Sequence, residues 1–212
     1  MPDSIDKALA KALTGTCRIG QVLIRKNDGR FVLSHRDDDP RDDFKIFHGA
    51  DDAIEIARYD DAGNYRPLKT APNLRHGWQL EMVDLNEVRR ALDCFYPGRL
   101  AMFAAQTQNR FETTPLRETL DRQSGMYRVA AKISDEQIDE VIGKFCRSNG
   151  GCLRTILWKR DKRGPIPSTK LPAEKFDPAH DQTGRGERAI PLLCQEACNL
   201  LVNECRKVVK TE

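Results

Sequence analysis

The alternation of apolar and polar positions indicates strands and short helices in the first half of the chain. Residues 3–13 repeat apolar side chains at helical spacing, which predicts an amphipathic helix that ends at Gly15. Two β-rich runs, 17–26 and 30–36, flank the turn sequence N-D-G, and an Asp-Gly between such runs predicts a β-hairpin. A helix and a hairpin so close together predict a small α/β-hairpin domain at the N-terminus.

An aspartate-rich segment follows the hairpin and resembles a divalent-cation site at first reading. Calcium loops require alternating oxygen ligands, a turn glycine and a distal Glu, and this spacing is missing here. We therefore predict a solvated loop that contains Asp37, Asp38, Asp39, Asp42 and Asp43. The histidines are interpreted as unpaired surface or hydrogen-bonded side chains: His35, His48, His76 and His180.

The remaining N-terminal elements are a helix, a strand and a second helix. Residues 50–59 predict a short helix, and the strand-like run W-Q-L-E-M-V follows a loop rich in Gly, Pro and Asn. Asp84 opens a helix whose apolar stripe consists of Leu85, Val88, Leu92 and Phe95. Because Pro97-Gly98 ends this helix, we predict a first domain over residues 1–97.

Helical periodicity dominates the second half of the chain. In the clearest helix Ser134 is the N-cap and acidic residues occupy the first turn. Its buried face is predicted to consist of Ile138, Val141, Ile142 and Phe145, and it leads directly into Cys146. Residues 98–212 are therefore predicted to form a mainly helical domain, and the whole chain to be α+β.

The composition of the chain disfavours several functional classes of protein. The 212 residues are 39% hydrophobic and 32% charged, and 35 basic against 32 acidic residues give a net charge of +3. This near balance disfavours a nucleic-acid-binding protein. Apolar runs are shorter than the roughly 18 residues of a membrane span, and the N-terminus lacks a signal-peptide pattern. We expect a cytoplasmic protein without membrane or nucleic-acid partners, in a compartment where thiols stay reduced.

Seven cysteines are the strongest chemical signal in the sequence. Two close pairs, Cys146/Cys152 and Cys194/Cys198, are separated by forty-one residues, and Cys205 follows. Pro191 precedes a predicted helix over 192–202, on which Cys194 and Cys198 share one face at i, i+4. Paired thiols of this kind are typical of a metal or iron–sulphur site. A glycine turn separates the two cysteines of the first pair.

Three interpretations of the paired thiols stay open on spacing alone. A structural zinc site needs four tetrahedral ligands, and its usual knuckles are C-x2-4-C, so the first gap of five residues is wide. A [4Fe–4S] cluster tolerates wider gaps because its ligands bind separate irons. The third interpretation is a set of buried core cysteines without a metal.

The sequence motifs around these cysteines resemble those of a known family. F-C-R-S-N-G-G-C-L-R-T-I-L-W and C-Q-E-A-C-N-L-L-V are similar to the iron–sulphur domain appended to sirohydrochlorin cobaltochelatase-like proteins. Y-R-P-L-K-T-A-P-N-L-R-H-G-W and F-Y-P-G resemble the stabilising domain of the same proteins. The spacing C-x5-C … C-x3-C is also similar to the ligand pattern of sulphite and nitrite reductases.

This resemblance implies a [4Fe–4S] cluster held by Cys146, Cys152, Cys194 and Cys198, with a redox, sensing or stabilising role in tetrapyrrole metabolism. The alternatives are a zinc-stapled interaction module and, less favoured, a fragment of a sirohaem-type reductase. The four histidines provide no chelatase metal site, so we expect no catalytic activity, and no catalytic residues, from this chain alone. The implied partner is a separate chelatase or an electron-transfer protein, which the polar connection between the cysteine pairs is predicted to contact.

Overall fold

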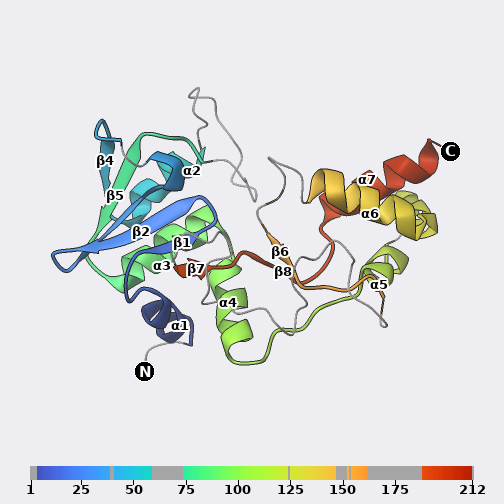
Figure 1. The fold of residues 1–212 in the computed structure, drawn as a ribbon, viewed down its shortest axis with the longest axis horizontal. Coiled ribbons are helices and arrows are strands. Elements are labelled where there is room, and N and C mark those ends of the chain that lie inside the picture. The colour runs from blue at the N-terminus through green and yellow to red at the C-terminus, as the bar shows by residue number, and fades with distance from the viewer. Residues whose placement is uncertain are drawn as a thin grey trace. The chain divides into compact units, whose positions relative to one another are not determined.

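A computed structural model describes residues 4–38, 41–58, 74–123, 125–146, 152, 154–161 and 188–211. The chain forms two compact units, each discontinuous in sequence. The first consists of Met1–Arg110 and Asp177–Leu192, and the second of Phe111–Phe176 and Leu193–Glu212. The mixture of sheet and helices confirms the predicted α+β class (Figure 1). None of the helices in the described ranges has the length and apolar character that crossing a bilayer requires.

The first unit is built on a mixed sheet, which has six strands among the described residues. Neighbouring strands follow the order β4-β5-β3-β2-β1-β7, and β4–β5 and β1–β7 are parallel pairs. Burial alternates along β5, where Trp78, Leu80 and Met82 point into the core. The strands are β1 (Cys17–Ile19), β2 (Val22–Asn27), β3 (Arg30–His35), β4 (Lys45–His48), β5 (Trp78–Met82) and β7 (Arg188–Ile190).

The predicted hairpin is confirmed as β2 and β3. Asn27 pairs with Arg30, and both central turn residues have positive φ, 47° at Asp28 and 82° at Gly29. Such a two-residue turn matches the twist of the flanking strands. The run before the turn contains an additional bend at Gly20 (φ 57°), which separates β1 from β2.

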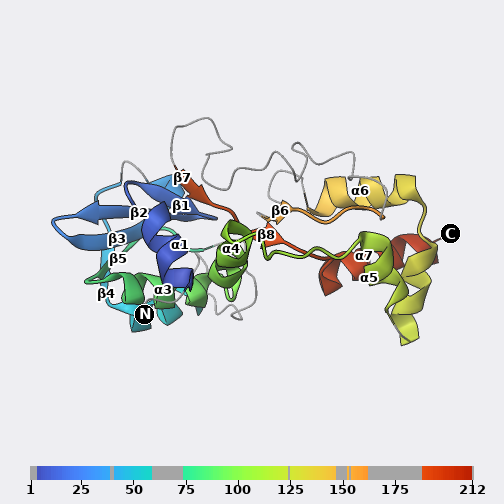
Figure 2. The ribbon, with the colours of Figure 1, turned by 90° about the horizontal axis from the view of Figure 1, so that it is seen from below.

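Helices complete the first unit, and Figure 2 shows α1 and α3 beside the sheet. Asp84 is the N-cap of α3, as predicted, and its side chain accepts a hydrogen bond from the Glu87 N–H at 2.9 Å. Val88, Leu92 and Phe95 are buried as predicted. The helices are α1 (Ser4–Ala12), α2 (Ala53–Arg58), α3 (Leu85–Phe95) and α4 (Arg99–Thr107), with short 3₁₀ turns η1 (Arg36–Asp38) and η2 (Ala50–Asp52).

The second unit is mainly helical in its described part, as predicted. The helices α6 and α7 contact each other, and α7 also packs on η3 (Figure 1). A pair of two-residue parallel strands, β6 and β8, accompanies them. The elements are α5 (Leu116–Asp121), η3 (Gly125–Lys132), α6 (Asp135–Phe145), β6 (Thr155–Ile156), β8 (Leu193–Cys194) and α7 (Asn199–Lys210).

Candidate metal centre

The first cysteine pair lies at the end of α6. Ser134 is the N-cap, as predicted, and it forms a capping box with Gln137, so the start of this helix is fixed. At the other end the Cys146 N–H donates to the Ile142 carbonyl at 2.9 Å, and the Cys152 N–H donates to the Phe145 carbonyl at 3.4 Å. Cys152 is therefore held near the end of α6, close to Cys146. The predicted glycine turn between them, 149–151, lies outside the described residues.

The second pair contradicts one prediction, because no helix covers 192–202. Cys194 lies in β8, and Cys198 is the N-cap of α7, which begins at Asn199. The spacing of apolar residues fits a helix, but backbone hydrogen bonds to distant parts of the chain hold Cys194 and Gln195 outside any helix. The Cys194 carbonyl accepts a hydrogen bond from the Leu157 N–H at 3.1 Å, and the next carbonyl, at Gln195, accepts one from the Thr114 N–H at 2.9 Å. The two thiols are therefore presented by a strand and a helix start, not by one helix face.

The surroundings of these thiols are apolar on one side. Cys146, Cys194 and Cys198 pack against the buried core of the second unit, which includes Trp158. Trp158 is 1% exposed, and its indole N–H donates to the Cys194 Sγ at 3.2 Å. Such a donor stabilises negative charge on sulphur, as expected for a thiolate ligand.

Burial raises the pKa both of Cys194, a candidate ligand, and of Cys205. Burial raises the pKa of Cys194; the Trp158 hydrogen bond and the positive charge of Arg154 oppose this shift, whereas the Cys198 and Cys152 thiols reinforce it. Cys205 is buried in the helical core, where desolvation raises its pKa to about 11. The two shifts have the same direction and the same main cause, so they do not decide which of the two thiols binds a metal.

The donor set suits an iron–sulphur cluster. All seven cysteines are free thiols, so those of the two pairs are not consumed by disulfides. Thiolates are the ligands that iron–sulphur clusters use, and the buried tryptophan supplies the hydrogen bond and apolar cover that tune them. Zinc is also bound by thiolates, so the ligand chemistry alone leaves both metals open.

The basic residues near the cysteines play a structural part where they are described. Arg160 forms ion pairs with Asp135 and Asp139, and Asp135 also pairs with Arg117. Arg117 additionally donates to the Ile133 carbonyl at 2.7 Å. These contacts join α5, α6 and the segment after β6. Most of the predicted contact segment, the forty-one-residue connection 153–193, lies outside the described residues, at 162–187.

A group of residues in the first unit was missed by sequence reasoning. The interpretation of the histidines as unpaired is wrong, since the His35 and His76 ring centroids lie 3.9 Å apart. Asp38 is buried beside them, so the predicted solvated loop is wrong at this position, although Asp37, Asp42 and Asp43 are exposed. Burial lowers the pKa of His35, and the charge of His76 lowers it further. Only the strand register reveals this group, and the sequence does not specify that register locally.

Two family models match consecutive parts of the chain. Residues 108–207 match a 4Fe-4S iron-sulfur cluster binding domain, and residues 5–107 match the DR2241 stabilising domain. Together they reach from residue 5 in α1 to residue 207 in α7. The predicted resemblance to the two appended domains is thereby confirmed, and the match over 108–207 points to iron–sulphur binding by the second unit.

A solved structure supports the same assignment. The chain is similar to DR2241 from Deinococcus radiodurans, with 26% identity and a TM-score of 0.71 over 98% of this chain. That crystal structure is described as a multi-domain protein with structural similarity to chelatases and two additional novel domains. This chain spans 41% of the length of DR2241. No curated protein matches the chain.

Proposed function

We propose that the second unit binds one [4Fe–4S] cluster through Cys146, Cys152, Cys194 and Cys198. The observation that carries the proposal is the match of 108–207 to an iron–sulphur domain that contains both cysteine pairs. The packing of three of these thiols on the core, and the indole N–H directed at Cys194, support the same set. When bound, such a cluster supplies one-electron transfer at a potential set by its surroundings.

The role proposed for the cluster is accessory to a tetrapyrrole chelatase. The similarity to DR2241, which is described as chelatase-like, supports this role. The chain would act in the cytoplasm on a separate partner, either a chelatase or an electron-transfer protein. It would stabilise this partner, regulate it by sensing redox state, or exchange electrons with it. Mixing the purified chain with a sirohydrochlorin chelatase from the same organism tests the partnership: a complex on size-exclusion chromatography is expected. Two unshifted elution peaks contradict it.

Metal analysis of anaerobically purified protein tests the cluster itself. We expect brown protein with iron and sulphide in the equal amounts that a [4Fe–4S] cluster contains. Colourless protein with zinc and no sulphide overturns the proposal and leaves the zinc-stapled module as the function of these thiols.

Substitutions at the second pair test the ligand set. Cys194→Ser and Cys198→Ser are expected to lose the iron, whereas Cys94→Ser, in the first unit, and Cys205→Ala keep it. Cys198→Ser is the sharper variant, because a serine at the N-cap of α7 favours the helix by about 0.5–2 kcal/mol over alanine. The start of α7 is therefore preserved in this variant, so iron loss cannot be ascribed to loss of the helix cap. Iron loss in Cys205→Ala, with the fold retained, would show that the ligand set is wrong.

A further inference from the structure

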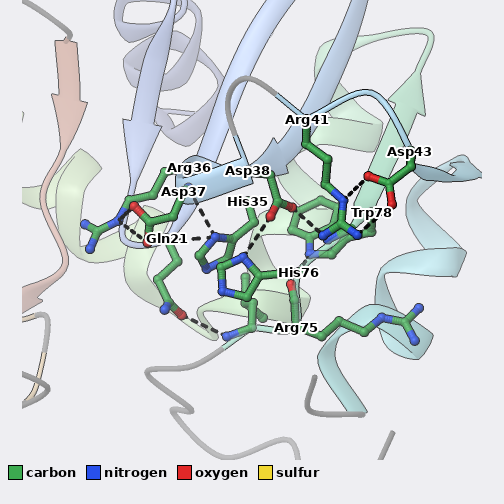
Figure 3. A network of polar contacts seen from close by, with 12 residues as sticks. Gln21, His35, Arg36, Asp37, Asp38, Arg41, Asp43, Arg75, His76 and Trp78 are labelled. Atoms are coloured by element: carbon green, nitrogen blue, oxygen red, sulfur yellow. Dashed lines mark hydrogen bonds and ion pairs between the residues drawn. The ribbon is translucent and has the colours of Figure 1, made fainter. Parts of the chain in front are cut away.

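Two histidines and an aspartate meet at one end of the first unit's sheet (Figure 3). His35 ends β3, Asp38 ends the following 3₁₀ turn η1, and His76 lies two residues before β5. The strands β3 and β5 are antiparallel neighbours, with Ser34 opposite Gln79. The end of one strand therefore lies beside the start of the other, and this register brings the three side chains together. One possible ligand atom from each lies within 4.8 Å of the other two.

The carboxylate of this group is held in place by its neighbours. The Asp38 side chain is 4% exposed. Its Oδ1 lies 2.8 Å from the His76 Nδ1, and its Oδ2 accepts a hydrogen bond from the Gly77 N–H at 2.8 Å. Burying a carboxylate is costly unless it is paired or binds a cation. The chain therefore maintains a fixed anionic oxygen next to two imidazoles.

One ring nitrogen of the buried histidine, His35, makes no hydrogen bond to the described residues. His35 is 1% exposed, and its Nε2 has no hydrogen-bond partner among the described residues. The other nitrogen, Nδ1, accepts a bond from the Asp37 N–H at 3.2 Å. Leaving a buried polar group unsatisfied costs about 1–3 kcal/mol. An imidazole nitrogen in this state, beside a second histidine and a buried carboxylate, is suited to receive a ligand.

We propose that His35, Asp38 and His76 bind a divalent first-row transition ion such as Zn²⁺, Co²⁺ or Fe²⁺. Imidazole is a preferred ligand of these ions, and two imidazoles with one carboxylate form a recurrent three-ligand set that leaves positions open. Ligand atoms around tetrahedral zinc lie about 3.4 Å apart, given bonds of roughly 2.0–2.1 Å. The ligand atoms, which lie within 4.8 Å of one another, must therefore approach by at most about 1.4 Å, which rotations of the side chains can provide.

The neighbouring Asp37 can support the metal-bound form. When Nε2 of His35 coordinates, the ring proton moves from Nε2 to Nδ1. Nδ1 then gives up the hydrogen bond that it accepts from the Asp37 N–H and needs an acceptor of its own. The Asp37 Oδ2 is 3.9 Å from that nitrogen, and its half-exposed side chain, which also pairs with Arg36 at 3.4 Å, can approach by rotation. A carboxylate in this position is the usual outer partner of a metal-binding histidine. The His76 side chain is 39% exposed, which gives an ion access from solvent.

Zinc binding to the intact, cluster-loaded chain tests the proposal. Because the site belongs to the first unit, it does not depend on the proposed cluster, and cluster-loaded protein keeps the thiols from competing. Equilibrium dialysis against Zn²⁺ should retain one ion per chain, and ¹⁵N spectra of the imidazoles should shift for His35 and His76. The exposed His48, whose side chain is 73% exposed on β4, should not shift and is the internal control.

Variants assign the ion to these ligands. His35→Gln, His76→Gln and Asp38→Asn should each weaken zinc binding at least 100-fold, and Asp37→Asn by about 10-fold, as for outer partners in known sites. His48→Gln should bind as the wild type does. Absence of imidazole shifts in the wild type overturns the proposal, and this outcome is independent of how the variants fold. Equal loss in His48→Gln, or full competition by Mg²⁺ at similar concentration, also overturns it.

Discussion

The two units differ in how much β-sheet pairing supports their cores. In the first unit a six-stranded sheet of described residues, closed by a tight hairpin, supports the core. In the second unit the only sheet of described residues pairs two residues of β6 with two of β8, and one of the four is Cys194. Three of the proposed ligands pack directly on its core.

This difference indicates where a bound metal contributes to stability. A short parallel ladder adds little by itself, so the segments that carry the cysteines are held by side-chain packing and by whatever joins the thiols. Metal binding at such a site is a contribution to the folding free energy. The first unit contains its own ladder and does not need the cluster. The two units are therefore expected to respond separately to perturbation.

Removing the iron is expected to give the largest effect. Anaerobic chelation should lower the melting temperature of the second unit by more than about 10 °C, since a tight ligand adds about 3–4 kcal/mol and each kcal/mol moves a small domain by about 4–8 °C. Differential scanning calorimetry of loaded and chelated protein measures this change. The first unit's transition should stay within about 2 °C. A single transition that moves as a whole contradicts the independence of the units.

Gly20→Ala is expected to do the converse, because it damages the first unit without touching the cysteines. A Cβ at this position would lie 2.6 Å from the Tyr96 Oη and 2.9 Å from the Leu192 Cδ1, at a φ of +57°. The Tyr96 hydroxyl, which accepts a bond from the Gln21 N–H at 2.8 Å, would have to move. We expect a loss of about 2–4 kcal/mol from strain and overpacking.

Gly15→Ala is the matched control for this variant. A Cβ at Gly15 meets no atom within 4 Å, and its φ is outside the left-handed region. Its melting profile should match the wild type. Both variants should keep their full iron content, so a loss of iron in Gly20→Ala would contradict the separation of the two units.

Local signals account for most of the elements that the sequence predicted. The hairpin, β5, the Asp84 cap and the Ser134 capping box each depend on residues within a few positions of one another. The start of α7 was missed because β6 and the segment before α5 hold the backbone at Cys194 and Gln195 in an extended form. The cysteine pairs were recognised because each pair is close in sequence.

The histidine group could not be recognised in the same way. Asp38 and His76 are 38 positions apart, and they meet only through the pairing of β3 with β5. Local residue patterns do not specify which strands become neighbours or at which register, so distant ligands of this kind leave no spacing signature. The hairpin turn fixes β3 against β2 but not against β5.

Trp158→Phe is expected to have a smaller effect, which is read out in the electronic properties of the cluster. It removes the indole N–H that donates to the Cys194 Sγ and keeps an aromatic ring in the core. Because this bond stabilises the more negative, reduced cluster, its loss should lower the reduction potential. A differential of about 1 kcal/mol corresponds to about 40 mV for one electron. Potentiometric titration followed by visible absorbance measures the shift.

A tryptophan in the first unit provides the control for this electronic effect. The Trp78 indole N–H donates to the Arg75 carbonyl at 2.6 Å, so Trp78→Phe makes the same chemical change away from the thiols. Its potential should equal that of the wild type. Equal shifts in both variants would show that the change is a general response to core substitution and not the loss of a bond to sulphur.

Asp28→Asn is expected to give the smallest change, and in the stabilising direction. Asp28 and Gly29 are the two central residues of the β2–β3 turn, and both have positive φ. Asn-Gly is favoured over Asp-Gly in such turns because asparagine tolerates the left-handed region well, so we expect a gain of about 0.5 kcal/mol. Calorimetry should show a rise in the first unit's transition alone. A rise in the second unit's transition would mean that the sheet also supports the cysteine-bearing segments, in which case removing the iron should destabilise both units.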